Sequence, residues 1–239
     1  MKLCVIPARG GSKRIPKKNI KDFFGKPLIS YSIKVALESN LFERVIVSTD
    51  DLEIAEISKE FGAEIPFIRP KELSDDHVGL EDVIDHAFAH FENLGERFEY
   101  ICTIYATAPF IKKTYINMGY EALRDSDAIN AFSCTSMPFP IQRTFKINKQ
   151  GRCEMFTPEH YQARSQDLEE AFHDAGQFCW TNKLRQEKNK KNMIYSEVSI
   201  PITVPRNLVQ DIDTPEDWIE AELLFEILKK KQKHRTIQR

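Results

Sequence analysis

The sequence predicts an α/β fold built on a doubly wound, mostly parallel β-sheet. Two observations support this prediction. Short apolar runs alternate with amphipathic helical patterns from the N-terminus to about Pro138, which is typical of strands joined by crossover helices. The runs are continuously apolar rather than alternating, as expected for strands that helices cover on both faces.

The predicted strands are short runs rich in β-branched and apolar residues. The first, Lys2-Leu3-Cys4-Val5-Ile6, ends in the turn-rich segment that follows Pro7. Residues 139–175 mix aromatic, charged and turn residues without this alternation, which predicts an insertion such as a β-hairpin arm or a lid. The predicted strands cover residues 2–6, 44–50, 64–68, 100–105, 127–135 and 198–204.

The predicted helices show apolar residues at a spacing close to 3.6. The final helix has the clearest start, because Thr214 is a candidate N-cap, Pro215 stands at the first helical position and Asp217 can complete a capping box. The predicted helices cover residues 27–37, 51–61, 81–91 and 114–124, with a last one that starts at Pro215.

Composition limits the classes of function. The 239 residues are 41% apolar and 29% charged, which is ordinary for a globular protein. The 34 Lys and Arg residues nearly balance the 36 Asp and Glu residues, so the formal net charge is −2. Because dedicated nucleic-acid binders usually carry a basic excess, we expect no nucleic-acid partner. The basic run from Lys229 to Arg239 is interpreted as a solvated helix end.

The cysteines and the N-terminus predict a cytoplasmic protein. Five cysteines are widely spaced without a C-x-x-C pair, which indicates neither a disulfide framework nor a zinc site. Charged residues from Arg9 onward interrupt any signal-peptide core, and no run approaches the ~18–20 apolar residues of a membrane span. The cysteines expected to be buried are Cys4, Cys102, Cys134 and Cys179.

The loop after the first strand is the first candidate site. Its adjacent glycines, Gly10 and Gly11, allow close backbone approach, and exposed N–H groups can form an anion-binding nest. Six cations surround them within thirteen residues, which suits a polyphosphate, although a solvated basic loop is the simpler alternative. The loop matches neither the P-loop nor the G-x-G-x-x-G pattern. The six cations are Arg9, Lys13, Arg14, Lys17, Lys18 and Lys21.

The second candidate site is the pair Asp211-x-Asp213. In an extended segment these two carboxylates point the same way, and hard oxygen ligands suit Mg²⁺, which binds one or two carboxylates together with substrate phosphates. Helix capping is the alternative, because the final helix starts directly after the pair.

Several motifs resemble those of a known enzyme family. They are Val5-Ile6-Pro7-Ala8-Arg9-Gly10-Gly11-Ser12-Lys13-Arg14 with Lys18-Asn19, Val47-Ser48-Thr49-Asp50-Asp51, Arg69-Pro70, Leu73-Ser74-Asp75-Asp76, and Gln210-Asp211-Ile212-Asp213-Thr214-Pro215-Glu216-Asp217-Trp218. They resemble the CMP-sialic acid synthetases, or acylneuraminate cytidylyltransferases. Two segments, Phe139-Pro140-Ile141-Gln142-Arg143 and His173-Asp174-Ala175-Gly176-Gln177-Phe178, look closest to one branch, the pseudaminic acid cytidylyltransferases.

The resemblance implies a Rossmann-like nucleotidyltransferase domain over residues 1–239, with a dimerisation and sugar-binding arm at 139–175. It implies transfer of CMP from CTP to the anomeric hydroxyl of pseudaminic acid, with Mg²⁺ as cofactor and a homodimer as the assembly. The implied catalytic residues are Arg9, Lys18 and Asp211, and the implied metal ligands are Asp211 and Asp213. The implied substrate-binding residues are Gly10, Gly11, Ser12, Asn19, Arg69, Tyr105, Gln142, Arg143 and Arg164.

Two alternatives remain open at this point. CMP-N-acetylneuraminate synthesis is the nearest one, but Tyr105 stands where sialic acid synthetases typically carry Gln. A non-catalytic nucleotide-binding protein is the alternative from another class. Retention of Arg9, Lys18, Asp211 and Asp213 argues against it, because a sensor does not need both phosphate and metal groups.

Overall fold

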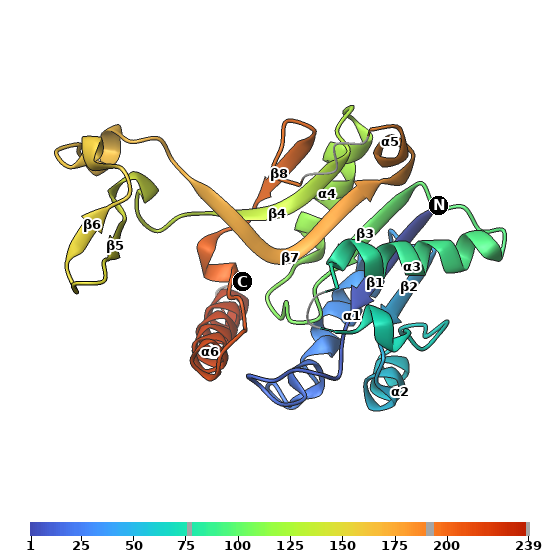
Figure 1. The fold of residues 1–239 in the computed structure, drawn as a ribbon. Coiled ribbons are helices and arrows are strands. Elements are labelled where there is room, and N and C mark those ends of the chain that lie inside the picture. Colours follow the sequence, from blue (N-terminus) through green and yellow to red (C-terminus); the bar gives the residue numbers. More distant parts are fainter. Residues whose placement is uncertain (76–77, 190–193, 238–239) are drawn as a thin grey trace.

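A computed structural model describes residues 1–75, 78–189 and 194–237 (Figure 1). In this part of the chain, a six-stranded sheet has the order β2-β1-β3-β7-β4-β8. The motif residue Asp76 and the last two residues of the basic run lie outside the described residues. The strands of the sheet are β1 (Lys2–Pro7), β2 (Arg44–Ser48), β3 (Tyr100–Ile104), β4 (Asn130–Ser136), β7 (Phe172–Asn182) and β8 (Ser199–Thr203).

The sheet is mostly parallel, as the sequence predicts. β1 pairs in parallel with β2 and β3, and β4 pairs in parallel with β8. β7 is the exception, because it runs antiparallel between β3 and β4. The sequence analysis did not assign this strand. Its first two residues, Phe172 and His173, are exposed, and Asp174 and Gly176 interrupt any apolar run at the point where the strand begins.

The predicted strand at residues 64–68 is wrong. Only one bridge forms there, from Glu64 to Ile46 in β2, and the segment beyond it is irregular. Pro66 explains the difference, because proline has no N–H to donate to a neighbouring strand.

Helices cover both faces of the sheet, which confirms the doubly wound architecture. Ile33 and Ile116, from α1 and α4, belong to the main core on one face. Ala87 and Phe91 of α3 pack against β1 and β3 on the other. The helices are α1 (Ile29–Ser39), α2 (Leu52–Glu60), α3 (Leu80–Asn93), α4 (Lys113–Arg124), α5 (Lys183–Lys188) and α6 (Pro215–Ile237).

β7 is fixed to α4 by close packing. The Trp180 indole N–H donates to the Ile116 carbonyl oxygen at 2.9 Å, and Trp180 is fully buried. A Cβ atom at Gly119 would stand 2.8 Å from Phe178 and 2.9 Å from Trp180. Glycine is therefore required at this position for the helix to approach the strand.

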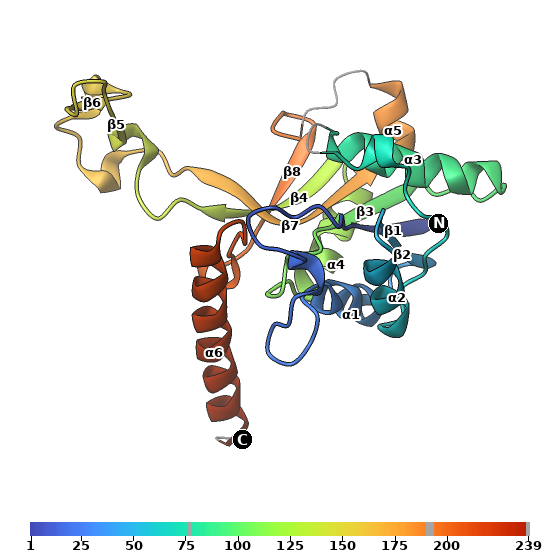
Figure 2. The same cartoon turned by 60° about the horizontal axis from the view of Figure 1, so that its bottom comes forward.

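The predicted capping box starts α6. The Asp217 N–H donates to Thr214 Oγ1 at 3.2 Å, and Asp217 Oδ2 accepts from the Thr214 N–H at 2.7 Å. Trp218 and Ala221 then pack α6 against Phe23 of the segment that follows the first loop. Beyond this contact, α6 projects away from the sheet (Figure 2).

The predicted insertion is an arm that leaves the sheet after β4 and returns into β7 (Figures 1 and 2). It contains a small antiparallel pair, β5 (Phe145–Ile147) and β6 (Cys153–Met155). The predicted boundary at residue 175 is too late, because β7 starts at Phe172.

The four cysteines expected to be buried are buried and free, whereas Cys153 on the arm is exposed. The described helices include none with the length and apolar character needed to cross a membrane.

Candidate active site

A pocket of about 550 Å³ opens where β1, β2 and β3 end, at the edge of the sheet where ligands of parallel α/β folds bind. The loop after β1 forms one wall, and another wall is formed by Arg69, Leu73, Ser74, Asp75, Val78, Leu80 and Val83. The residues of interest that line it are Arg9, Ser12, Lys13, Arg14, Lys18, Asn19, Arg69, Tyr105 and Asp213.

Gly10 of the loop is required for a steric reason. The Gly10 N–H donates to Asp50 Oδ1 at 3.1 Å, which draws the loop against the end of β2. A Cβ atom at Gly10 would stand 2.5 Å from Asp51 Oδ2, so a larger residue would clash. Asp51 cannot easily give way, because its carboxylate caps α2 by accepting from the Glu53 and Ile54 N–H groups. Gly11 is exposed and has open space around it.

Asn19 supports the loop from beneath. Its side chain is buried, and its Nδ2 donates to the Arg9 carbonyl oxygen at 3.0 Å. This hydrogen bond fixes the backbone that carries Arg9.

Not all six cations of the loop face the pocket. Arg9, Lys13, Arg14 and Lys18 line it. Lys17 instead pairs with Glu53 of α2. In the same way, Lys21 lies over the Trp218 ring, with Nζ 4.0 Å from the ring centroid. The pocket therefore receives four of the cations that the sequence suggested for a polyphosphate.

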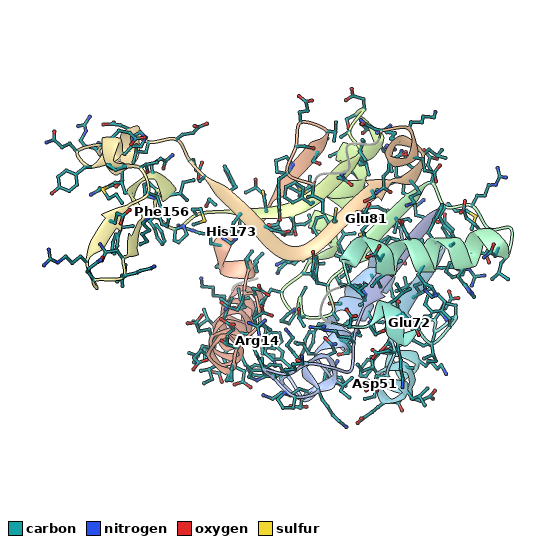
Figure 3. The ribbon with its side chains drawn as sticks, viewed as in Figure 1. Arg14, Asp51, Glu72, Glu81, Phe156 and His173 are labelled. Carbon is teal, nitrogen blue, oxygen red and sulfur yellow. The ribbon has the colours of Figure 1, made fainter. Side chains whose placement is uncertain are left out.

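Lys18 and Arg14 converge on Asp213. Lys18 Nζ lies 3.1 Å from Asp213 Oδ1, and Arg14 Nη2 lies 2.8 Å from Asp213 Oδ2. Figure 3 shows Arg14 beside the start of α6, although the two are far apart in sequence. Desolvation alone would raise the pKa of Asp213, but the hydrogen bonds and charges of Lys18 and Arg14 outweigh it and lower the pKa.

Asp211 has the opposite shift. Partial desolvation raises its pKa first, and the negative charge of Asp213 raises it further, while Lys18 acts against both. Asp211 is exposed and does not line the pocket of the single chain. Its carboxylate is still close enough to Asp213 for the two charges to interact.

The donor set suits a hard divalent cation. The described residues contain no group of three or more His, Cys, Asp or Glu side chains arranged to hold a metal. Mg²⁺ needs no such cage, because it usually takes one or two carboxylates and completes its shell with water and substrate phosphates. Asp211 and Asp213, beside a cationic phosphate pocket, fit this requirement.

Arg69 is a buried cation behind the pocket. Its Nη1 donates to the Ser48 carbonyl oxygen at 2.9 Å, and its Nε donates to Ser74 Oγ at 3.0 Å. Nη2 lies 3.7 Å from Asp50 Oδ1, the atom that also accepts from Gly10. Burial lowers the pKa of Arg69, although Asp50 offsets part of this effect. Arg69 thus connects the two walls of the pocket.

Tyr105 lines this pocket directly after β3. Its N–H donates to the Gln177 carbonyl oxygen of β7 at 3.0 Å. Burial raises the pKa of its phenol, and the charges of Asp174 and Asp211 add to this effect. Tyr105 therefore lies within electrostatic reach of both carboxylates.

The second pocket has a volume of about 310 Å³. Its walls include the apolar side chains of Phe132, Phe172 and Ile194, and Asp174 is one of several polar residues that line it. The Asp174 carboxylate accepts from the Tyr195 hydroxyl at 3.0 Å and from the Gly176 N–H at 2.7 Å. Sequence reasoning identified Asp174 within a motif but missed Tyr195, since a lone Tyr beside a turn carries no recognisable signal.

Three predicted sugar-binding residues lie on the arm and line neither pocket. Gln142 Nε2 donates to the Glu169 carbonyl oxygen at 3.1 Å, and Arg164 Nε pairs with Asp167 at 2.8 Å. Arg143 Nη1 donates to Ser165 Oγ at 3.5 Å. In a single chain these contacts hold the arm together. Figure 3 shows Phe156 on this arm, and His173 where the arm meets the sheet.

The fold and the cationic pocket at the carboxyl edge of its sheet indicate an α/β nucleotidyltransferase. A family model described as cytidylyltransferase matches residues 3–233. The chain belongs to the cytidylyltransferase family and is a CTP-dependent enzyme.

Named relatives lie within the same family. The pseudaminic acid cytidylyltransferase of Campylobacter jejuni subsp. jejuni serotype O:2 is 44% identical over 226 residues, which cover 94% of this chain and 96% of that protein. The CMP-N,N'-diacetyllegionaminic acid synthase of Legionella pneumophila is 32% identical, covering 94% of this chain and 96% of that protein. The N-acylneuraminate cytidylyltransferase of Escherichia coli O18:K1:H7 is 27% identical, covering 98% of this chain and 53% of that protein.

A solved structure has the same fold. CMP:2-keto-3-deoxy-manno-octonic acid synthetase, solved in complex with CTP, superposes with a TM-score of 0.68 at 18% identity. The match covers 94% of this chain and 98% of that one.

Proposed function

We propose that this chain transfers CMP from CTP to the anomeric hydroxyl of pseudaminic acid. The anomeric oxygen forms a bond to the α-phosphorus, the bond to the pyrophosphate oxygen breaks, and pyrophosphate leaves. The hydroxyl proton passes to a general base. The observation that carries this proposal is the cationic pocket beside Tyr105, in a chain 44% identical to a pseudaminic acid cytidylyltransferase.

The phosphate loop supports the nucleotide half of the reaction. Arg9, Ser12 and Lys18 line the pocket and would hold the triphosphate through charge-assisted hydrogen bonds. Gly10 and Gly11 would let the phosphates approach the backbone. Asp211 and Asp213 would hold Mg²⁺, which supplies charge neutralisation at the α-phosphate when it is bound.

The second pocket supports pseudaminic acid as the acceptor. Pseudaminic acid differs from N-acetylneuraminic acid in its ring stereochemistry, in a second acylated nitrogen, and in a methyl terminus that replaces a hydroxylated tail. Phe132, Phe172 and Ile194 would take apolar groups such as this methyl, and Asp174 would accept from an acylated N–H. Tyr105 would separate this sugar from the triphosphate and leave its anomeric hydroxyl toward the first pocket.

The arm would complete the site of a second copy. It exposes large apolar side chains, among them Phe145 at 55%, Ile147 at 73% and Phe156 at 63%. Such side chains on a projecting element favour burial against another chain. We propose a two-fold homodimer in which Gln142, Arg143 and Arg164 reach the sugar bound by the other copy. Free, buried cysteines agree with a reducing, cytoplasmic location.

Pyrophosphate release tests the reaction. The purified chain is assayed with CTP, Mg²⁺ and, in parallel, pseudaminic acid, N-acetylneuraminic acid and N,N'-diacetyllegionaminic acid. We expect the highest kcat/KM with pseudaminic acid and CMP-pseudaminate as the product by mass spectrometry. A higher kcat/KM with either other sugar would reject this acceptor and leave the cytidylyltransferase class intact.

Mixing two impaired variants at a CTP concentration below the wild-type KM tests the arm. Arg9→Ala damages the nucleotide side and Arg164→Ala damages the arm, so each variant alone is expected to lose most of its activity at that CTP concentration. In an equal mixture, exchange would give mixed dimers with one intact site, and about a quarter of the wild-type activity should return. No recovery after subunit exchange would show that Arg164 does not act across a dimer.

A further inference from the structure

The pairing of β7 with β4 is irregular near the middle of both strands. The register of the two strands shifts between Phe132 and Cys134 of β4. Ser133 lies at this shift, and its Oγ accepts from the backbone N–H groups of Gln177 and Phe178 at 3.2 Å each. A side chain therefore satisfies two N–H groups that a regular ladder would pair with backbone. Such irregularities redirect side chains and are frequent beside active sites.

The irregularity directs the side chain of Gln177 into the protein. Gly176, directly before it, has a φ of +61°, a conformation that glycine adopts without steric cost. Gln177 itself is only 3% exposed. Its Nε2 donates to the carbonyl oxygen of Leu208, which is 31 residues further along the chain. The amide thus links β7 to the segment that follows β8.

This hydrogen bond determines how the Gln177 amide is oriented. A carbonyl oxygen such as that of Leu208 can only accept, so the amide nitrogen must face it. The other amide atom, Oε1, is buried and has no hydrogen-bond partner among the described residues. An unpaired buried acceptor costs free energy. The bond to Leu208 is therefore the polar contact that the side chain provides, and it is made despite this cost.

Leu208 lies directly before the two candidate metal ligands. It ends a short 3-10 helix (Arg206–Leu208), and Asp211 follows three residues later. On the far side of Asp211, Lys18 Nζ donates to the Ile212 carbonyl oxygen and pairs with Asp213. The segment that carries both carboxylates is thus held before Asp211 by Gln177 and after it by Lys18.

The same residue also holds Tyr105. The backbone carbonyl oxygen of Gln177 accepts from the Tyr105 N–H at 3.0 Å. Gln177 therefore contacts the residue that lines the phosphate pocket through its main chain, and the segment of Asp211 through its side chain. A single buried residue sets the distance between these two parts of the site.

We propose that Gln177 is a positioning residue, which holds the segment of Asp211 and Asp213 against the strand that carries Tyr105. This inference rests on the proposed role of the two aspartates as Mg²⁺ ligands. Residues that orient metal ligands without touching the metal typically contribute about ten- to hundredfold to metal affinity or activity. Loss of the Gln177 amide should therefore weaken metal binding more than it weakens the fold.

Metal binding without turnover provides the first test. Mn²⁺, which takes the same oxygen ligands as Mg²⁺, is titrated and its free concentration is measured by electron paramagnetic resonance. The nucleotide is a CTP analogue with a methylene group between the α- and β-phosphates, so no pyrophosphate leaves. Gln177→Met, a variant of similar size without a donor, should bind Mn²⁺ about tenfold more weakly than the wild type. Unchanged Mn²⁺ affinity in Gln177→Met would overturn the proposal.

Two controls accompany this titration. Asn130→Leu removes a buried amide at the other end of β4, where Asn130 accepts from the Thr181 hydroxyl at 3.0 Å. It should lower the melting temperature and leave Mn²⁺ binding unchanged; if it weakens binding as much as Gln177→Met, the loss reflects general destabilisation and the proposal fails. Asp211→Asn should also bind Mn²⁺ weakly. If it does and Gln177→Met does not, only the role of Gln177 fails, whereas normal binding by Asp211→Asn rejects the metal site itself.

Gln177→Glu tests the hydrogen bond and keeps the proposal testable if Gln177→Met does not fold. Burial raises the pKa of the introduced carboxyl. When protonated it can donate to the Leu208 carbonyl oxygen, and when ionised it repels that oxygen. The neighbouring ionisable groups, Asp174, Tyr105 and Asp211, are the same in both proteins, so the ratio of variant to wild-type kcat/KM isolates residue 177. This ratio should rise about tenfold from about pH 8 to about pH 6. A constant ratio would overturn the proposal.

Discussion

Lys18 Nζ lies 3.1 Å from Asp213 Oδ1, so a cation expected to bind phosphate is paired with a carboxylate expected to bind metal. The pair joins the loop after β1 to the entrance of α6, which are 195 residues apart in sequence. The two opposite charges stabilise each other. CTP with Mg²⁺ would offer each group a stronger partner, so nucleotide and metal are expected to bind together rather than in sequence.

Arg9→Ala should raise the KM for CTP roughly ten- to hundredfold. The physical reason is the loss of a hydrogen bond to a charged group, which contributes about 1.5–3 kcal/mol. Steady-state kinetics with pyrophosphate detection measures the change. Lys17→Ala is the control, because Lys17 belongs to the same loop but pairs with Glu53 outside the pocket. If the two variants behave alike, Arg9 does not contact the triphosphate.

Asp211→Asn and Asp213→Asn should each lower kcat/KM by about two orders of magnitude or more, because each removes a hard ligand and a negative charge. EDTA should abolish the activity of the wild type, and added Mg²⁺ should restore that activity. Asp217→Asn distinguishes metal binding from helix capping, because it weakens only the cap of α6. This variant should have a lower melting temperature and should keep its activity. Full activity in EDTA would exclude the metal.

The effect of Asp213→Asn on stability should depend on pH. The folded pKa of Asp213 lies below its ordinary value of 3.8, so the carboxylate stabilises the fold fully above that value. The stabilisation is lost as the pH falls through the folded pKa. Thermal melts should therefore show a destabilised variant at pH 7 and a progressively smaller difference from the wild type as the pH falls below 3.8. A constant difference at every pH would mean that Lys18 and Arg14 do not act through charge.

Asp174→Asn should lower kcat/KM for pseudaminic acid and leave the KM for CTP unchanged. The reason is that Asp174 lines only the second pocket, where its carboxylate would accept an N–H from the sugar. Tyr195→Phe removes the hydroxyl that orients this carboxylate and should have a smaller effect in the same direction. A site built to bind one polar group can discriminate by orders of magnitude. An increased KM for CTP would instead place Asp174 on the nucleotide side.

Features that depend on neighbouring residues could be predicted from the amino-acid sequence. The alternation of apolar runs and helical patterns was enough to predict the layers of the sheet and its helices, and the capping box of Thr214 and Asp217 was predicted from four consecutive residues. The phosphate loop was predicted because its glycines and cations are adjacent in the chain. Pro66 shows the limit of such local reasoning, since an apolar run with one missing N–H does not pair as a strand.

Contacts between groups that are distant in sequence became known from the three-dimensional structure alone. β7 becomes a central strand because β3 and β4 offer it hydrogen-bonding edges on both sides, and its own first residues give no local sign of this. Arg69 is buried behind the pocket because Ser48, Asp50 and Ser74 surround it. Tyr195 and Asp174 are 21 residues apart in sequence, and the fold brings them together as a hydrogen-bonded pair in the lining of the second pocket. A sequence pattern records the preferences of neighbouring residues, whereas these contacts depend on how the packed elements are placed in space.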